Sequence, residues 1–268
     1  MQENDRSIAA RALLRWYVDA GVDEAIGLLP NDCFVIETKE APGASKPAAR
    51  SVSAPVTAIR PSDLPSADEA ALLAARMAAA CSTHDELAEA VSSFTGCPLR
   101  SGARNTCFAD GVPGSSLLVI GEAPGRDEDA VGKPFVGRAG QLLDKMLAAI
   151  GRSRAADTLI SNVVYWRPPG NRAPTLAEIA ICRPFVERLI ELTAPKAIML
   201  AGGVPTQALT GAAGIMRARG QWREISLQSG ARFQALPVFH PAFLLRQPAQ
   251  KRLAWADLQT LSARLRDA

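Results

Sequence analysis

The sequence predicts an α/β protein with three layers, α/β/α, in which helices cover both faces of a central, mostly parallel four-stranded sheet. Two observations support this prediction. Short apolar runs alternate with longer segments of helical periodicity after about residue 94. The run Leu117–Ile120 is apolar throughout, as in a parallel strand buried on both faces. The predicted strands are Leu117–Gly121, Leu159–Val164, Ala197–Ala201 and Leu236–Phe239.

The N-terminal quarter of the chain has a different composition from the rest. Residues 6–21 show helical periodicity, which predicts a helical extension over residues 1–39. The stretch from Glu40 to Pro65 has five prolines and no aromatic residue, so we expect a flexible linker over residues 40–66. A single catalytic domain is then predicted over residues 67–268.

Predicted helices alternate with the strands of that domain along the chain. Two precede the first strand, Ala67–Ala80 and Thr83–Phe94, the second with a capping box formed by Thr83 and Glu86. A hairpin strand, Trp222–Leu227, turns at Ser229-Gly230 before the last strand. The remaining predicted helices are Gly137–Ile150, Leu176–Leu192, Val204–Leu209 and Gln250–Arg266.

Composition narrows the class of protein. The chain has 268 residues, of which 48% are apolar, and no run of 18 apolar residues that would indicate a membrane span. Its polar start lacks the apolar stretch of a signal peptide, so we expect a cytoplasmic protein. The five cysteines show no Cys-x-x-Cys spacing and are expected to be reduced. The net charge is only +3, but 24 arginines outnumber six lysines, which suits bidentate phosphate contacts or reflects a general arginine bias.

The segment from Val119 to Gln141 is the most informative part of the chain. A buried strand runs into the tight turn Gly-Glu-Ala-Pro-Gly, and a second glycine cluster opens the next helix. Ligands of α/β sheets bind beyond the carboxyl ends of the strands. There we expect the carboxylate of Glu122, the ring of Phe135, the cation of Arg138 and free backbone N–H groups at the helix start. These groups suit a flat, polar ring attached to a phosphate chain.

This segment resembles a motif of the family-4 uracil-DNA glycosylases, a class that usually carries an iron–sulfur cluster. Three further segments agree in order and spacing: Ser161-Asn-Val-Val, then Pro168-Pro-Gly-Asn-Arg with Ile181-Cys-Arg-Pro-Phe, and His240-Pro-Ala-Phe-Leu-Leu-Arg. The resemblance covers residues 94 to 268. It implies a monomeric, monofunctional enzyme of base excision repair that hydrolyses uracil from single- or double-stranded DNA and leaves an abasic site.

The resemblance also implies the residues that bind and release the base. His240 would donate a hydrogen bond to uracil O2, where negative charge develops. Asn162 would read O4 and N3–H together, because an amide both donates and accepts. Phe135 would stack on the base, beside Gly121 and Ala123. The structural alternatives are a histidine that caps a carbonyl, an asparagine that bonds its own turn, and a core phenylalanine.

A carboxylate near the cationic sugar and the attacking water is also required. Glu122 is the candidate, although family-1 enzymes place an aspartate one residue later, where this chain has Ala123. The alternative roles for Glu122 are to exclude a 5-methyl group or to support the pocket. Asp127 and Asp129 are substitutes, or belong to a plain acidic turn.

Several residues are predicted to contact DNA outside the base pocket. Leu244 would fill the gap left by the extruded base. Its alternative is a core position on a helix. The polar side chains predicted to contact DNA are Arg138, Gln141, Arg167, Arg172 and Arg246.

The chain departs from the resemblance at the cluster. Cys97 and Cys182 stand at two of the four cysteine positions, but Phe94 and Trp166 stand at the others. Two thiolates do not supply the roughly four protein ligands that such a cluster needs. We therefore predict no cluster, no metal and no other cofactor, with the two rings packed in its place.

Two other functions compete with excision. One is a module on the same fold that binds uracil-containing or abasic DNA with weak turnover. The segment Tyr165–Pro174 contains neither an inserted loop nor a histidine, which argues against covalent capture of the product. The other is an unrelated α/β phosphohydrolase, which would need a cluster of metal ligands that the sequence does not show.

Overall fold

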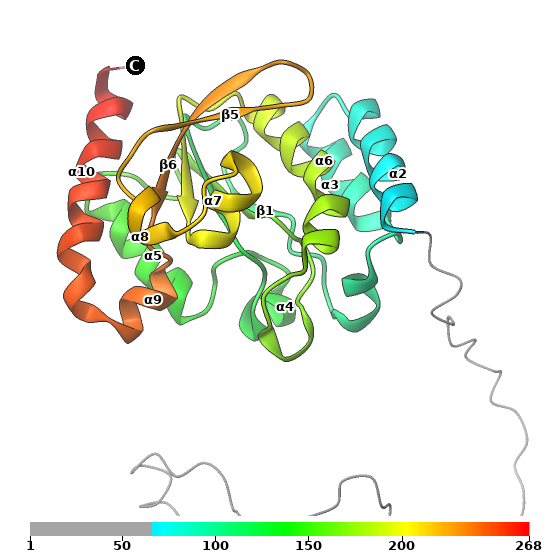
Figure 1. Ribbon diagram of the computed structural model, residues 1–268, viewed down its shortest axis with the longest axis horizontal. Coiled ribbons are helices and arrows are strands. Elements are labelled where there is room, and N and C mark those ends of the chain that lie inside the picture. The colour runs from blue at the N-terminus through cyan, green and yellow to red at the C-terminus, as the bar shows by residue number, and fades with distance from the viewer. Residues whose placement is uncertain (1–65, 268) are drawn as a thin grey trace, which may run out of the picture. The chain divides into compact units, whose positions relative to one another are not determined.

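The computed structural model describes residues 66–267, and all of its described elements are shown in Figure 1. The predicted N-terminal helix at residues 6–21, the extension 1–39 and the linker up to residue 65 lie outside the described residues. Ser66 caps the first described helix, α2 (Ala67–Ala80), through a capping box with Glu69. Both bounds of this helix agree with the prediction.

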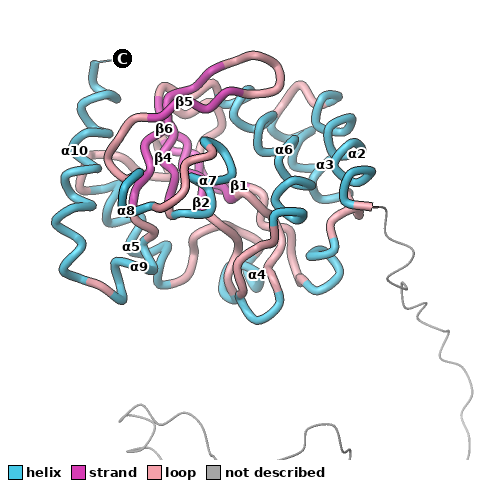
Figure 2. Tube along the Cα trace, in the orientation of Figure 1, coloured by secondary structure: helices cyan, strands magenta, loops and turns pink. Residues whose placement is uncertain are grey.

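The sheet has six strands in the order β1-β3-β2-β4-β6-β5, so the predicted number of four was too low. The four predicted strands form the parallel centre, and β1 and β5 pair antiparallel at the two edges. Figure 2 shows the strands in magenta between the helices. The strands are β1 Ala109–Gly111, β2 Leu117–Gly121, β3 Thr158–Asn162, β4 Ala197–Ala201, β5 Arg223–Ser226 and β6 Arg232–Val238.

Of the two edge strands, β5 was predicted from the sequence and β1 was not. The hairpin β5–β6 was predicted, because a polar turn separates two alternating segments. Strand β1 was not predicted, because Ala109-Asp110-Gly111 is short and lacks an apolar run. It forms because the backbone of β3 offers a free edge, and Ala109 pairs with Ser161 there.

Alternate side chains of β2 face two separate hydrophobic layers. Leu118 and Ile120 pack with helices α2, α3 (His84–Ser93), α6 (Leu176–Thr193) and α7 (Gly203–Thr210). Leu117 and Val119 pack with α5 (Arg138–Ala148), α9 (Pro241–Arg246) and α10 (Lys251–Asp267). Helices therefore cover both faces of the sheet, as predicted. None of the helices within residues 66–267 is both long and apolar enough to cross a membrane.

Besides strand β1, the sequence did not predict the short helical segments. They are α4 (Arg126–Val131), α8 (Ile215–Ala218), and the 3-10 turns η2 (Pro98–Gly102), η3 (Pro169–Asn171) and η4 (Pro248–Gln250), together with α9. The predicted capping box at Thr83 forms only in part. Thr83 Oγ1 accepts the N–H of Glu86, but the Glu86 carboxylate accepts the N–H of Ser82 instead of that of Thr83.

The parallel centre brings the carboxyl ends of four strands to one edge. Because β3 and β4 flank β2 on opposite sides, the chain reverses its direction across the sheet at β2, where α/β proteins bind ligands. Glu122 follows β2, Asn162 ends β3, Gly202 follows β4, and His240 lies two residues beyond β6.

Candidate functional site

A cavity of about 550 Å³ lies at this edge of the sheet. It brings together the predicted residues Glu122, Ala123, Phe135 and His240 from segments up to 118 positions apart in the chain, along with Arg172 and Arg246. The other lining residues, which sequence reasoning did not select, are Pro124, Gly125, Glu128, Ala139, Pro168, Asn171 and Ala242.

The predicted residues Gly121 and Asn162 do not line the cavity, but lie close to the Phe135 ring, which does, where β2 and β3 end side by side. Gly121 pairs with Asn162 in the parallel register. A Cβ atom on Gly121 would lie 2.4 Å from Asn162 Oδ1 and 2.5 Å from the Phe135 ring, so only glycine allows these three residues to meet. Asn162 is 1% exposed, and its Oδ1 has no hydrogen-bond partner among residues 66–267. A buried acceptor without a partner is costly, so this atom is available to a donor on a ligand.

Phe135 is held in an unusual backbone conformation. Its φ is +53°, in the left-handed region, which costs a non-glycine residue about 1–3 kcal/mol. Gly140 on α5 packs against this backbone so closely that a Cβ atom there would lie 1.8 Å from the Phe135 carbonyl oxygen. The ring lies 5.6 Å from that of His240 between centroids, at an interplanar angle of 30°. The conformation therefore places the ring against the two polar residues predicted to bind the base.

His240 caps the first turn of α9. Its Nδ1 accepts the N–H of Ala242 at 3.1 Å, which leaves Nε2 as the protonated nitrogen of the neutral ring. Burial, reinforced by the charge of Arg246 and opposed by that of Glu128, lowers the pKa of His240 to about 4. The ring is thus neutral at physiological pH, and Nε2–H can donate to an oxygen on which negative charge develops.

The candidate carboxylates have different surroundings. Glu122 lines the cavity, and burial raises its pKa. Asp129, one of the two substitutes, is instead buried beneath a loop, where it accepts the N–H groups of Arg104 and Asn105. Asp127 is exposed on α4 and is absent from the cavity lining. The geometry therefore favours Glu122 over both substitutes.

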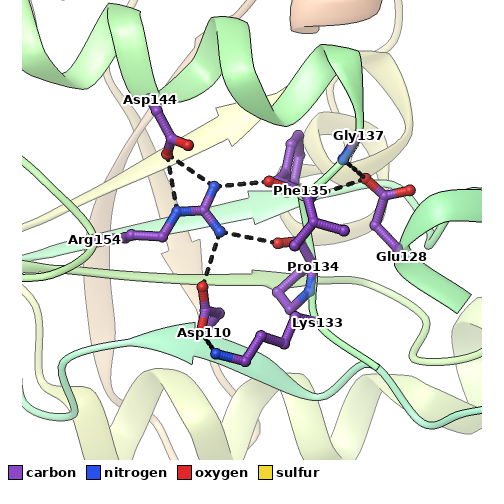
Figure 3. A network of polar contacts seen from close by, with 9 residues as sticks. Asp110, Glu128, Lys133, Pro134, Phe135, Gly137, Asp144 and Arg154 are labelled. Carbon is purple, nitrogen blue, oxygen red and sulfur yellow. Dashed lines mark hydrogen bonds and ion pairs between the residues drawn. The ribbon is translucent and has the colours of Figure 1, made fainter. Parts of the chain in front are cut away.

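Glu128 is the carboxylate that the sequence analysis missed. Its Oε1 accepts the N–H groups of Val136 and Gly137 at 3.0 and 2.9 Å, the second of which is labelled in Figure 3. Its Oε2 accepts the N–H of Gly125. The N–H groups at the start of α5, predicted to be free for a phosphate, are thus partly occupied from within the chain. Glu128 follows the Gly-Glu-Ala-Pro-Gly turn by only three residues, which was the one available signal.

The residues predicted to contact DNA differ in their position relative to the cavity. Arg138 and Gln141 are exposed on α5, outside the cavity lining. Arg167 donates to Asn171, which lines the cavity. Arg172 also lines it, but both of its Nη atoms donate to the buried carboxylate of Glu178. Arg246 lines the cavity from α9.

Leu244 has the core position that was its alternative interpretation. It is 1% exposed and packs in the layer formed by α5 and α10. A helical turn that buries Leu244 turns its neighbour outward, and Leu245 is 37% exposed. In the DNA-free protein Leu244 therefore has the core position of its alternative interpretation, and its role as a DNA wedge stays a prediction.

The four positions at which the resemblance places cluster cysteines do come together, but they do not fit a cluster. Cys97 and Cys182 are buried and hydrogen-bonded to each other, which lowers the pKa of Cys97 and, together with burial, raises that of Cys182. The rings of Phe94 and Trp166 lie 6.4 Å apart between centroids, and both are 1% exposed. Trp166 Nε1 donates to Thr106 Oγ1, so this ring is fixed as part of the core. Across residues 66–267, no three His, Cys, Asp or Glu side chains are grouped to hold a metal.

We expect purified protein to contain no iron and to be colourless, because two thiols with two packed rings cannot replace four thiolate ligands. Absorbance near 400 nm and metal analysis of freshly purified protein test this expectation. About four irons per chain would contradict it. The double substitution Phe94→Cys with Trp166→Cys is a matched comparison, since it restores the full set of cysteines at these positions.

Comparison with known proteins agrees with the α/β fold. Residues 108–259, which include every residue that lines the cavity, match the uracil DNA glycosylase superfamily. Type-4 uracil-DNA glycosylases are similar to the chain. That of Thermotoga maritima is 34% identical over 183 residues, 66% of this chain and 94% of its own. That of Archaeoglobus fulgidus is 35% identical over 182 residues, 66% of this chain and 90% of its own.

The fold and the cavity thus define an α/β protein with its candidate site at the carboxyl edge of the sheet. The chain belongs to the uracil-DNA glycosylase superfamily. A third relative, the type-4 uracil-DNA glycosylase of Pyrobaculum aerophilum, is 34% identical over 178 residues, 65% of this chain and 90% of its own.

Proposed function

We propose that this protein hydrolyses the N-glycosidic bond of uracil in DNA and leaves an abasic site for base excision repair. The observation that carries the proposal is the unpartnered Oδ1 of Asn162, buried beside the ring of Phe135. Uracil supplies the missing donor through N3–H and an acceptor for the same amide through O4. Membership of the uracil-DNA glycosylase superfamily supports this assignment of the base.

The reaction follows from the charges that develop as the bond breaks. The base leaves as an anion and the sugar becomes cationic, after the nucleotide has been turned out of the duplex. His240 Nε2–H donates to the base oxygen that gains negative charge, and the neutral ring needs no proton transfer to do so. Glu122, as a carboxylate on the cavity wall, stabilises the sugar cation and orients the attacking water.

The proposal is tested with a uracil-containing oligonucleotide, single- or double-stranded, and no added metal. Excision leaves an abasic site, so alkali then cuts the strand at the former uracil. A matched oligonucleotide with thymine at that position should remain whole. A stable gel shift without strand cleavage after alkali would overturn the proposal and favour a module that only binds damaged DNA.

We expect protonation of Glu122 to cause the fall in excision rate at low pH, the acid limb of the pH–rate profile. Burial raises the pKa of Glu122, so its carboxylate is lost as pH falls, while His240 stays neutral until about pH 4. The single-turnover rate should therefore decline on acidification through a value above the ordinary pKa of 4.5. Glu122→Gln should be slower at neutral pH and lack this limb. An unchanged limb in Glu122→Gln would assign it to another group.

We expect the affinity for DNA to fall steeply with salt while the preference for uracil does not. Arginine contacts to phosphates release counterions, whereas Asn162 and Phe135 read the base in a buried slot. Arg138→Ala or Arg246→Ala should weaken binding to uracil and thymine DNA alike and reduce the salt slope by about one unit each. Arg232→Ala is the control, because this arginine is 71% exposed at the opposite end of the parallel strands. Loss of uracil preference in either variant would contradict this separation.

A further inference from the structure

Arg154 lies in the turn between α5 and β3 and reaches the loop that carries Phe135. Its Nη1 donates to the carbonyl oxygen of Pro134 at 3.1 Å, and its Nη2 donates to that of Phe135 at 2.7 Å (Figure 3). The carbonyl of Phe135 belongs to the residue whose φ is +53°. Arg154 is absent from the cavity lining and has no role in the site described above.

Two carboxylates orient this guanidinium. Asp110 of β1 accepts from Nη1 at 2.9 Å, and Asp144 of α5 accepts from Nε at 2.9 Å and lies 2.8 Å from Nη2. With the two carbonyls, these contacts supply an acceptor for each of the five N–H donors of an arginine. The side chain is 18% exposed, so the contacts are largely shielded from water. Only a planar fork can make all of them at once.

The loop is also held from the opposite side. Glu128 accepts the N–H groups of Val136 and Gly137, and Arg154 donates to the carbonyl groups of Pro134 and Phe135. Four consecutive residues are therefore bound by two side chains of opposite charge. Such a double restraint is what keeps a non-glycine residue in the left-handed region.

Asp110, one of the two carboxylates that orient Arg154, remains charged over a wide pH range. Burial of Asp110 tends to raise its pKa, but hydrogen bonds and charge from Arg154 and Lys133 outweigh burial and hold that pKa below its ordinary value. Lys133 Nζ lies 2.9 Å from Asp110, and Lys133 immediately precedes Pro134. Lys133 and Arg154, the two cations that contact Asp110, thus both connect it to the Phe135 loop, as Figure 3 shows.

We propose that Arg154 is a positioning residue for the reaction: it fixes the Phe135 loop so that the ring is already in place when the base enters. This inference rests on the proposed function, because it assigns to Phe135 the stacking face for uracil. Arg154 touches neither the base nor the sugar and acts only through the carbonyl groups of the loop. Preorganisation of this kind affects capture of the base and the rate of its release.

The test compares three variants with the unchanged protein in single-turnover excision of uracil. Arg154→Ala should lower the maximal rate or raise the half-saturating concentration so that their ratio falls about 10- to 100-fold, within the loss expected for removing one stacking ring. Arg154→Lys should recover only part of this loss, because an ammonium group cannot hold both carbonyls and both carboxylates. Arg152→Ala is the matched control.

Arg152 is suited to that role because it lies in the same turn with similar exposure, 20%. It pairs with Asp157 at 2.9 Å and does not contact the Phe135 loop. Its variant should lose a comparable ion pair and a comparable amount of thermal stability while excising uracil at the unchanged rate. Equal losses of activity in Arg152→Ala and Arg154→Ala would show a merely structural effect and overturn the inference.

A double substitution distinguishes action through the ring from any other effect. If Arg154 acts through Phe135, then Arg154→Ala combined with Phe135→Ala should be no slower than Phe135→Ala alone. Multiplied losses would overturn the inference while the proposed function stands. Absence of excision by the unchanged protein would instead remove the proposed function.

In that event hydrogen exchange still decides whether Arg154 holds the loop. Backbone amides of residues 133–140 should exchange at least about tenfold faster in Arg154→Ala than in Arg152→Ala. Equal exchange in the two variants would contradict the restraint itself.

Discussion

His240→Ala should bind uracil-containing DNA nearly as tightly as the unchanged protein and excise uracil about 100- to 1,000-fold more slowly. In the proposed reaction, Nε2–H of His240 would donate to an oxygen whose charge is small in the bound base and large as the base departs. Its contribution is therefore concentrated in the transition state and is almost absent from binding. The expected loss corresponds to about 2.7–4 kcal/mol of activation free energy.

Single-turnover excision and fluorescence anisotropy, measured on the same oligonucleotide, separate the two effects. The chain contains its own control, because it has only one other histidine. His84 lies at the start of α3 and contacts Thr193 Oγ1 at 3.0 Å, away from the cavity. His84→Ala should excise uracil at the unchanged rate. An unchanged rate in His240→Ala would reduce that histidine to a cap for the N–H of Ala242.

Asn162→Ala should lose both the rate of excision and the preference for uracil. The variant removes the amide that would distinguish the O4 and N3–H of uracil from the amino group and unprotonated N3 of cytosine, so uracil and cytosine DNA should bind with similar affinity. The loss of rate should reach at least about 100-fold, because the base is no longer held against His240 and Phe135.

Asn162→Asp tests the same assignment without a change of side-chain volume. A carboxylate accepts hydrogen bonds but cannot donate to O4, so excision of uracil should fall nearly as far as in the alanine variant. Near-normal excision by Asn162→Asp would show that the amide donor is not used. Thermal melting of both variants checks the alternative that Asn162 serves only its own turn, in which case stability rather than rate would fall.

The sequence predicted those parts of the fold that depend on long apolar patterns. The strands Leu117–Gly121 and Ala197–Ala201 and the helix Ala67–Ala80 have the predicted bounds. Strand β1 and the short helices α4, α8 and α9 escaped prediction, because three to six residues carry no period that can be recognised. These elements form where longer neighbours offer a free edge or a surface.

The candidate site could be predicted as a set of residues but not as an arrangement. Motifs at strand ends indicated Glu122, Phe135 and His240, and these do line one cavity. The positive φ of Phe135 and the roles of Glu128 and Arg154 depend on contacts with backbone carbonyl and amide groups. The positions of these groups cannot be predicted from the side-chain types in the sequence. The burial of Leu244 depends on the rotation of a six-residue helix, which periodicity could not fix.

The packed rings of Phe94 and Trp166 affect what a cell needs in order to complete this protein after synthesis. A core closed by side chains alone is complete once the chain has folded, and needs no machinery that assembles and delivers inorganic sulfide and iron. Such a core would also expose no iron to peroxide or superoxide. Under the proposed function, excision of uracil would then not depend on the supply of iron.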